Sequence, residues 1–325
     1  MNPLELAKAL HAALTEADRT VVNGDGIHDT FTVSVDVGDP GKARPLDKAR
    51  ASALGLCPTK AAFEARGVKP THESQPYHLF LMGKLVGAYT AAALKNFLPL
   101  GLGRVTTEVE VEYENTLGHV DILLNSPTNE ATVIECKFSE KSTIQDHWMM
   151  QAALYQLATN AKHAFVIVTN RYNWTIYYLW HTYEFGEDIW KAQRFTGEVL
   201  EDVNPYEDYD LNRAELLEAI NEQLRYLRPE ETPLAIDRLF ANYDGKYVKP
   251  AHWQCFTVLA QPYRYKTNRG TSGYAAGEVK PGAGKVSCPF AGHCHPVLSI
   301  YQSEFEITIG DDDQPGLIYE RDSDA

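Results

Sequence analysis

Two carboxylates and a lysine lie close together in two stretches that alternate like neighbouring β-strands. Residues 118–121, Gly-His-Val-Asp, open one stretch, and residues 134–137, Ile-Glu-Cys-Lys, lie in the next. Alternate residues of a strand share a face, so Glu135 and Lys137 project together, and a short turn places Asp121 beside Glu135. Carboxylates on adjacent strands suit Mg²⁺ or Mn²⁺, which can activate the water that attacks a phosphodiester. The lysine would orient that water or stabilise charge developing on phosphorus.

An amide and a phenol follow on the next expected helix, over residues 144–159. Gln151 and Tyr155 are four residues apart and therefore share one helix face. Together they can hold a DNA backbone beside the metal. The alternatives are core packing for Tyr155 and an ordinary ion pair of Glu135 with Lys137 on a surface sheet.

In this order, Gly-x-x-Asp at 118–121, Glu-x-Lys at 135–137 and Gln-x-x-x-Tyr at 151–155 resemble the PD-(D/E)XK nuclease superfamily, in its RecB-like branch. The resemblance covers roughly residues 50–300. It implies a restriction-endonuclease-like core. The site residues that it implies are the metal ligands Asp121, Glu135 and the backbone carbonyl of Cys136, the catalytic Lys137, and the DNA contacts Gln151 and Tyr155.

The branch also carries a histidine metal ligand in a Gly-x-x-x-His-like context. The matching stretch here is 83–87, with Gly87 where the histidine is expected. His78, two turns earlier, or His72 is available as a substitute ligand. Without either, the site lacks this ligand and holds metal more weakly.

Four cysteines flank the core, one before it and three after it: Cys57, Cys255, Cys288 and Cys294. The arrangement resembles the iron–sulphur nucleases of the branch, namely the CRISPR-associated RecB-like exonucleases and the AddB nuclease domain. It implies a [4Fe–4S] cluster that clasps the chain ends. The 32 residues between Cys255 and Cys288 depart from the family spacing, so either the loop carries an insertion or Cys255 is no ligand. Four thiolates also suit zinc.

The remaining pattern predicts the elements that position these residues. Strands are expected over 31–37, 104–114, 118–125, 131–138, 163–169 and 174–180, and helices over 2–16, 76–98, 144–159 and 211–228, with helical composition over 51–65. This order predicts an α/β fold with a central mixed β-sheet flanked by helices. The side chain of Cys136 is expected to point into the core. The predicted divisions are an N-terminal segment 1–50, a nuclease domain 51–302 and an acidic tail 303–325.

The charge of the chain is uneven. The 325 residues are 44 % hydrophobic with a net charge of −14, which by itself argues against nucleic acid. Twelve acids and four arginines at 200–244 give −8, and eight acids and one arginine at 303–325 give −7. Residues 245–302 carry seven Lys or Arg against one acid, a net +6, with tyrosines among them. Such a segment suits phosphate contact and base stacking, or is a solvated loop.

Five sparse cysteines, no basic and apolar leader and no clean apolar span predict a cytoplasmic protein without a membrane contact. The expected function is a Mg²⁺- or Mn²⁺-dependent DNA exonuclease acting on single strands or ends. Its setting would be recombination, end processing or CRISPR adaptation, with a cellular or viral source, partner proteins and a homo-oligomer all open. The rivals are a DNA-binding RecB-like protein that cuts poorly and a metal-stabilised interaction module.

Overall fold

The protein is described here by a computed structural model. It covers residues 2–23, 45–68, 77–139, 143–170, 172–184, 186–203, 210–227, 264–266 and 272–274. These residues divide into two compact units. The larger unit takes the described residues of 2–23, 47–55 and 77–224, and the smaller takes those of 45–46, 56–68 and 225–274.

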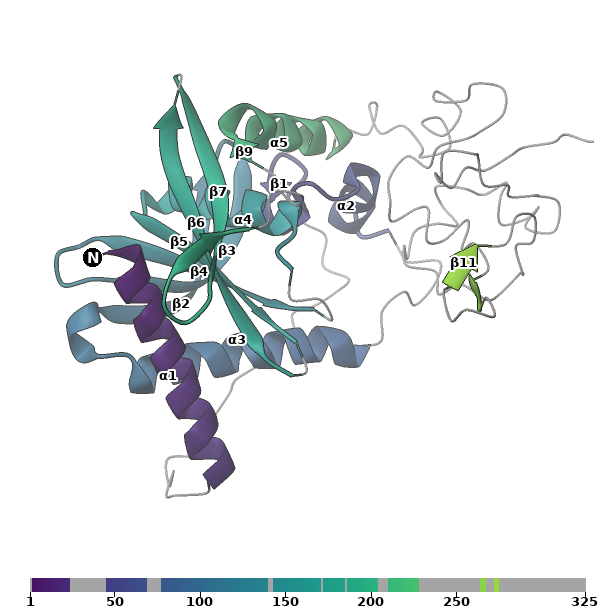
Figure 1. Ribbon diagram of the computed structural model, residues 1–325. Helices are drawn as coiled ribbons and strands as arrows, with labels where there is room; N and C mark the ends of the chain where they lie inside the picture. Colours follow the sequence, from purple (N-terminus) through teal and green to yellow (C-terminus); the bar gives the residue numbers. More distant parts are fainter. Residues whose placement is uncertain are drawn as a thin grey trace, which may run out of the picture. The chain divides into compact units, whose positions relative to one another are not determined.

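The larger unit holds the sheet and most of the helices (Figure 1). Its elements are α1 (Pro3–Asn23), β1 (Ala49–Arg50), η1 (Ala51–Ala53), α3 (Tyr77–Phe97), η2 (Leu100–Leu102), β2 (Arg104–Tyr113), β3 (Thr116–Asn125), β4 (Ala131–Phe138), α4 (Asp146–Thr159), β5 (His163–Thr169), β6 (Trp174–Glu184), β7 (Glu187–Phe195), β8 (Leu200–Asp202), β9 (Leu211–Asn212) and α5 (Arg213–Leu227), whose last three residues belong to the smaller unit. The smaller unit contains α2 (Pro58–Ala65) and the hairpin of β10 (Arg264–Lys266) and β11 (Ser272–Tyr274).

The nine strands β1 to β9 form one mixed, open sheet. Its order is β1-β3-β4-β5-β6-β7-β8, with β2 also paired to β3 and β9 to β7. Strands β3 and β4 are antiparallel, whereas β4 and β5 are parallel and are joined through α4. The expected α/β class with a mixed central sheet between helices is therefore confirmed.

Each face of the sheet builds its own apolar core, because successive side chains of a strand point to opposite faces. In β5, Ala164, Val166 and Val168 pack with α4 and α5. Phe165 and Ile167 pack with α1 and α3 on the other face. The half-buried strands that carry the candidate site are thus fixed from both sides.

Several element boundaries differ from the sequence prediction. Helix α1 runs to Asn23, and β6 runs to Glu184. Strand β7 was not predicted, because its sequence, EDIWKAQRF, carries charged residues on a half-exposed strand. Its anchor is Trp190, fully buried, whose Nε1 donates to Gln156 Oε1 at 2.9 Å. The strand expected over 31–37 lies outside the described residues.

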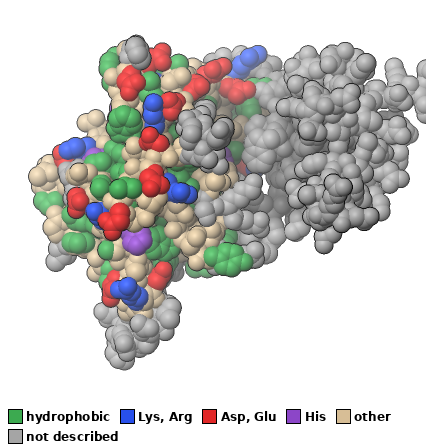
Figure 2. Space-filling view, viewed as in Figure 1, with side chains coloured by type: hydrophobic (Ala, Val, Ile, Leu, Met, Phe, Trp, Pro, Cys, Tyr) green, Lys and Arg blue, Asp and Glu red, His purple; other side chains and the backbone are tan. Residues whose placement is uncertain are grey.

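The charged segments are described only in part. Helix α5, in the acidic segment, buries Leu216 and Ile220 and exposes acids on its other side, as its periodicity predicts. Figure 2 shows acidic and basic side chains interspersed on one face of the described residues. The basic segment 245–302 is described only at β10 and β11, and the tail 303–325 is not described. None of the described helices is long and apolar enough to span a membrane.

Candidate active site

The two predicted carboxylates lie side by side where the pairing of β3 and β4 ends. The antiparallel register runs from Asn125 opposite Ala131 to Ile122 opposite Ile134. Asp121 and Glu135 are the next residues on either strand, beyond the last backbone pair. Here the Cys136 N–H donates to Asp121 Oδ2 at 2.8 Å, so a side chain takes the place of a strand carbonyl. The predicted juxtaposition of Asp121 with Glu135 is confirmed.

Lys137 is held between a carboxylate and an amide. Its Nζ lies 2.7 Å from Glu135 Oε1 and 2.6 Å from Gln151 Oε1. The Gln151 Nε2 in turn donates to the Tyr155 hydroxyl at 3.0 Å. This chain of hydrogen bonds runs from β4 to α4, because residues four apart on a helix share a face.

Most of this network is closed to solvent. Glu135 is 2 % exposed, Gln151 4 % and Tyr155 1 %. A direct contact with a DNA backbone requires surface that Gln151 and Tyr155 do not present here. Their geometry favours another role, which is to hold the Lys137 ammonium in one position.

The two carboxylates make ionisation costly for each other. Burial raises the pKa of Glu135 to about 8, and the negative charge of Asp121 adds to this effect while Lys137 opposes it. Burial likewise raises the pKa of Asp121, against the opposing charge of Lys137. Burial also raises the pKa of the Tyr155 phenol. A divalent cation between the carboxylates would offset the cost of both charges.

One oxygen of the site has no hydrogen-bond donor among the described residues. Glu135 Oε2 is buried and accepts no hydrogen bond, whereas Oε1 accepts from Lys137; only a protonated Glu135 carboxyl can hydrogen-bond to Asp121. Buried carboxylate oxygens without a partner are costly and call for an unseen ion or water. Hard oxygen donors of this kind suit Mg²⁺ or Mn²⁺. The residues present therefore fit the metal that the sequence predicts.

The donor set is small. Across the described part of the chain, no three His, Cys, Asp or Glu side chains are close enough to form a metal site by themselves. Asp121, Glu135 and the backbone carbonyl of Cys136 would be the protein ligands. This set is compatible with Mg²⁺, which keeps several waters and binds through one or two carboxylates.

Gly118, the first residue of the Gly-x-x-Asp motif, makes room for Tyr155. A Cβ at position 118 would lie 2.5 Å from Tyr155 Cε1, 2.8 Å from its hydroxyl and 2.7 Å from Ala51 Cβ. None of these distances is tolerated in folded proteins, so the tyrosine has to move. The lack of a side chain at Gly118 thus allows Tyr155 to take the position in which it hydrogen-bonds to Gln151, the amide partner of Lys137.

Gly118→Ala is therefore expected to destabilise the protein by about 2 kcal/mol, since overpacking in a core costs that order. The melting temperature should fall by roughly 5 °C. Gly101→Ala is the matched control, because a Cβ at position 101 meets no atom within 4 Å. Equal melting temperatures for the two variants would contradict the tight contact of Gly118 with Tyr155.

Helix α3 lies against the face of β4 that is opposite to α4. A Cβ at Gly87 would lie 4.0 Å from Cys136 Cβ, and one at Gly83 4.0 Å from Phe138 Cβ. Position 87, where the resemblance expects a histidine, thus adjoins the residue whose carbonyl is the predicted ligand. His78 lies in the first turn of α3, about 13 Å further along the helix axis at 1.5 Å per residue. The His78 side chain and all of His72 lie outside the described residues.

Of the four cysteines predicted to hold a cluster, only Cys57 lies among the described residues. Cys57 is buried and directly precedes Pro58, the first residue of α2 in the smaller unit. Cys255, Cys288 and Cys294 lie outside the described residues. Cys136 is part-buried and packs against the core on the α3 face, as expected.

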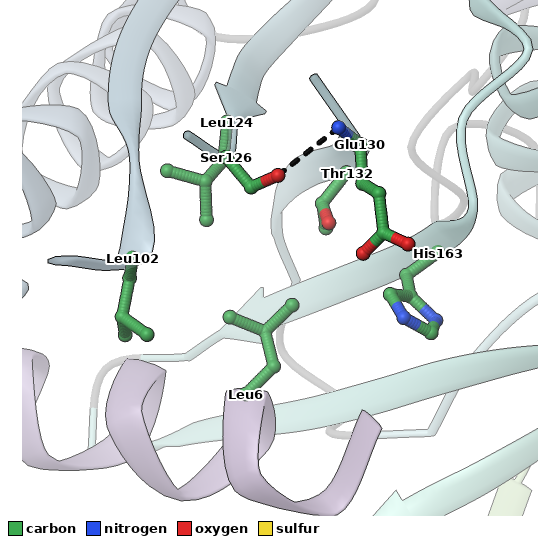
Figure 3. A pocket seen from close by; sticks show the side chains of 7 residues that line it. All are labelled: Leu6, Leu102, Leu124, Ser126, Glu130, Thr132 and His163. Carbon is green, nitrogen blue, oxygen red and sulfur yellow. Dashed lines mark hydrogen bonds between the residues drawn. The ribbon is translucent and has the colours of Figure 1, made fainter. Parts of the chain in front are cut away.

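Two hollows in the described surface lie away from these residues. One is a cavity of about 10 Å³ between α1 and the β3–β4 turn, lined by residues that include Leu6, Glu130 and His163 (Figure 3). It has room for about one water molecule. The other is an open groove of about 290 Å³ beside Trp174 and Phe195. Neither contains a residue of the carboxylate–lysine network.

One acidic residue near the site was missed by the sequence prediction. Glu108 in β2 lies one strand away from Asp121, and its charge contributes to the raised pKa of Asp121. In the sequence it belongs to an alternating run with Glu110 and Glu112. Nothing in that run distinguishes it, because the signal is a backbone angle that only the structure contains.

Comparisons with known proteins add little to this geometry. No protein-family model matches the chain, and no curated protein matches it. The chain is similar to a solved structure described as "Crystal structure of SSO0001", with 14 % sequence identity and a TM-score of 0.35. That match covers 58 % of this chain and 80 % of the other. A TM-score of this size carries no argument about fold or function.

Proposed function

We propose that the protein is a Mg²⁺- or Mn²⁺-dependent deoxyribonuclease of the RecB-like PD-(D/E)XK type. The observation that carries the proposal is the pair of part-buried Asp121 and buried Glu135. Lys137 hydrogen-bonds to Glu135 Oε1, and Glu135 Oε2 has no donor among the described residues. A structural ion pair needs one carboxylate and one ammonium. The second carboxylate and the unused oxygen are what a cation site requires.

Each residue of the site would have a separate role in phosphodiester hydrolysis. A bound divalent cation would polarise the phosphodiester and lower the pKa of an attacking water. Asp121, Glu135 and the Cys136 carbonyl would hold that cation. Lys137 would orient the attacking water and stabilise charge developing on the phosphate oxygens. Gln151 and Tyr155 keep the ammonium in place.

The proposed substrate is DNA, as single strands or duplex ends, cut as an exonuclease in recombination, end processing or CRISPR adaptation. The basic segment 245–302, with a net charge of +6, would supply the phosphate contacts that the buried Gln151 and Tyr155 do not. Partner proteins and a homo-oligomer are parts of the same proposal.

The proposal extends to a [4Fe–4S] cluster held by Cys57, Cys255, Cys288 and Cys294, with zinc as the alternative. Its support is the resemblance of the one-plus-three cysteine pattern. The burial of Cys57 directly before Pro58 agrees with an ordered thiol at that end. Analysis of the purified chain for iron and labile sulphide, against zinc, distinguishes the two.

The experiment that tests the nuclease proposal is cleavage of end-labelled linear DNA by the full chain, with Mn²⁺, with Mg²⁺ and with a chelator. Lys137→Met is expected to lower the cleavage rate about 100-fold, which is the scale for one lost electrostatic contact to the transition state. Mn²⁺ binding, measured by calorimetry, should persist because both carboxylates remain.

Lys162→Met is the matched control, since Lys162 also forms an ion pair with a glutamate, Glu130, at 2.6 Å on the surface. It should cut like the unchanged protein. An intact chain that leaves DNA uncut with either metal would contradict the nuclease proposal and favour the weakly cutting DNA-binding protein. The observation that favours this second candidate is a glycine, without a ligating side chain, at position 87 beside Cys136.

A further inference from the structure

Three acidic residues lie at one level of the sheet, on three neighbouring strands. In the β2–β3 register, Thr107 opposite Ile122 and Val109 opposite Val120 bracket Glu108 and Asp121, which therefore face each other. Continued by one residue, the β3–β4 register places Glu135 opposite Asp121. The backbone pairing lapses at this level on both sides of β3. Residues that are directly opposite on antiparallel strands have neighbouring Cβ atoms. The three carboxylates do not form a metal site as they stand, because Glu108 pairs with Lys84 of α3.

The backbone of Glu108 is unusual for a residue inside a strand. Its φ is +51°, in the left-handed region that a glutamate rarely adopts. Such conformations cost of order 1–3 kcal/mol and cluster at functional sites. The turn of the chain redirects the Glu108 side chain relative to its neighbours Glu110 and Glu112, which keep ordinary strand geometry.

The charge of Glu108 reaches the candidate site. After burial, which dominates, Glu108 is one of the groups that raise the pKa of Asp121. The Glu108 side chain is 59 % exposed, and its Oε1 lies 3.6 Å from Lys84 Nζ of α3. An exposed side chain with one loose ion pair can move toward a new cation at little cost.

An independent observation indicates that a ligand belongs at this level of the sheet. Glu135 is 2 % exposed, and its Oε2 has no partner among the described residues. The charge of Asp121 lies close enough to raise the pKa of Glu135. A buried oxygen that is unused beside a second carboxylate is an incomplete coordination site.

We infer that Glu108 supplies a third carboxylate to the divalent cation held by Asp121 and Glu135. The inference rests on the proposed function. It also accounts for the glycine at position 87, because a ligand from β2 replaces one from α3. Lys84, one turn before Gly87 on the same helix, holds Glu108 while the cation is absent and releases it when the cation binds.

The test is Mn²⁺ binding to the full chain without DNA, measured by titration calorimetry. Glu108→Gln is expected to raise the Kd for Mn²⁺ about tenfold or more with the stoichiometry unchanged. Glu110→Gln is the matched control, because Glu110 is an exposed acid on the same strand, paired with His119 at 3.5 Å. Its Kd should stay within about twofold of the unchanged protein. Lys84→Met is expected to lower the Kd, since Glu108 no longer has a competing partner.

The Mn²⁺ affinities of the Glu108, Glu110 and Asp121 variants separate a third ligand from a general charge effect and from the cation site itself. Equal weakening by Glu108→Gln and Glu110→Gln overturns the inference, because it shows only a general effect of surface charge. Normal binding by Glu108→Gln, with binding lost in Asp121→Asn, overturns the inference and leaves the nuclease proposal standing. Normal binding by Asp121→Asn as well overturns the cation site itself.

The backbone of Glu108 provides a second readout. Glu108→Gly removes the carboxylate but suits the left-handed φ, so it is expected to raise the melting temperature while it weakens Mn²⁺ binding. A structural role for the carboxylate would lower both. Opposite signs for stability and metal affinity therefore support a ligand that is held at the expense of backbone strain.

Discussion

Glu135→Gln is expected to reduce DNA cleavage at least about 1,000-fold, to the background of the assay. The change keeps the size and shape of the side chain but removes the charge that a divalent cation and Lys137 both require. No neighbouring acid takes its place, because Asp121 accepts from the Cys136 N–H and Glu108 lies two strands away from Glu135, on β2. Losses on this scale follow when a group that stabilises transition-state charge is removed together with its cation.

The same variant separates catalysis from folding. Ionising a carboxyl at 2 % exposure is a cost to the fold, so near pH 8 and without divalent cations Glu135→Gln should unfold at the same temperature or higher. Glu130→Gln is the control, because Glu130 pairs with Lys162 outside the network. Cleavage by Glu135→Gln at the unchanged rate would refute the assignment of the active site, whatever its stability.

Much of the frame of this site was predictable from alternation alone. Strand β4 and strand β5 were predicted with their observed bounds, 131–138 and 163–169. The sequence pattern is strong because apolar residues alternate with Glu135 and Lys137 in β4, and because apolar residues occupy both faces of β5. The side-by-side placement of Asp121 and Glu135 followed from one short turn between two such strands. Local pattern therefore fixes this part of the site.

The roles of Gln151 and Tyr155 were not predictable in the same way. Their spacing indicates a shared face, and that is confirmed. Whether a shared face meets solvent or a neighbouring strand depends on packing over Gly118, which is remote in sequence. The closed arrangement makes the pair part of the support for Lys137. An exposed arrangement would have made it a surface for DNA.

Glu108 was missed for a different reason. Periodicity treats every acid of β2 alike, whereas the left-handed φ of one residue sets it apart. The left-handed backbone of Glu108 coincides with the gap in the β2–β3 pairing and has no local sequence signature for a glutamate. Residues of this kind are found only when the register of three strands is known together.

The last prediction concerns pH and the protein free of divalent cations. The pKa of Glu135 is raised from an ordinary 4.5 to about 8, first by burial and then by Asp121. Between those values the folded chain keeps a proton that the unfolded chain has lost, so the unfolding free energy must fall as pH rises. The slope is at most about 1.4 kcal/mol per pH unit for one group, and the total between those two pKa values is at most about 5 kcal/mol. Denaturant unfolding in the presence of a chelator, at steps from pH 5 to pH 9, measures it.

Two comparisons make this pH dependence specific to Glu135. Glu135→Gln carries no titrating proton at this position, so its curve should lack most of the fall, and it should exceed the unchanged protein in stability near pH 8. Excess Mn²⁺ should stabilise the unchanged protein more at pH 8 than at pH 5, because a cation competes with the proton for the same oxygens. Parallel curves for the two proteins would show that Glu135 ionises normally. That result would remove the electrostatic argument for the proposed cation at the carboxylate pair.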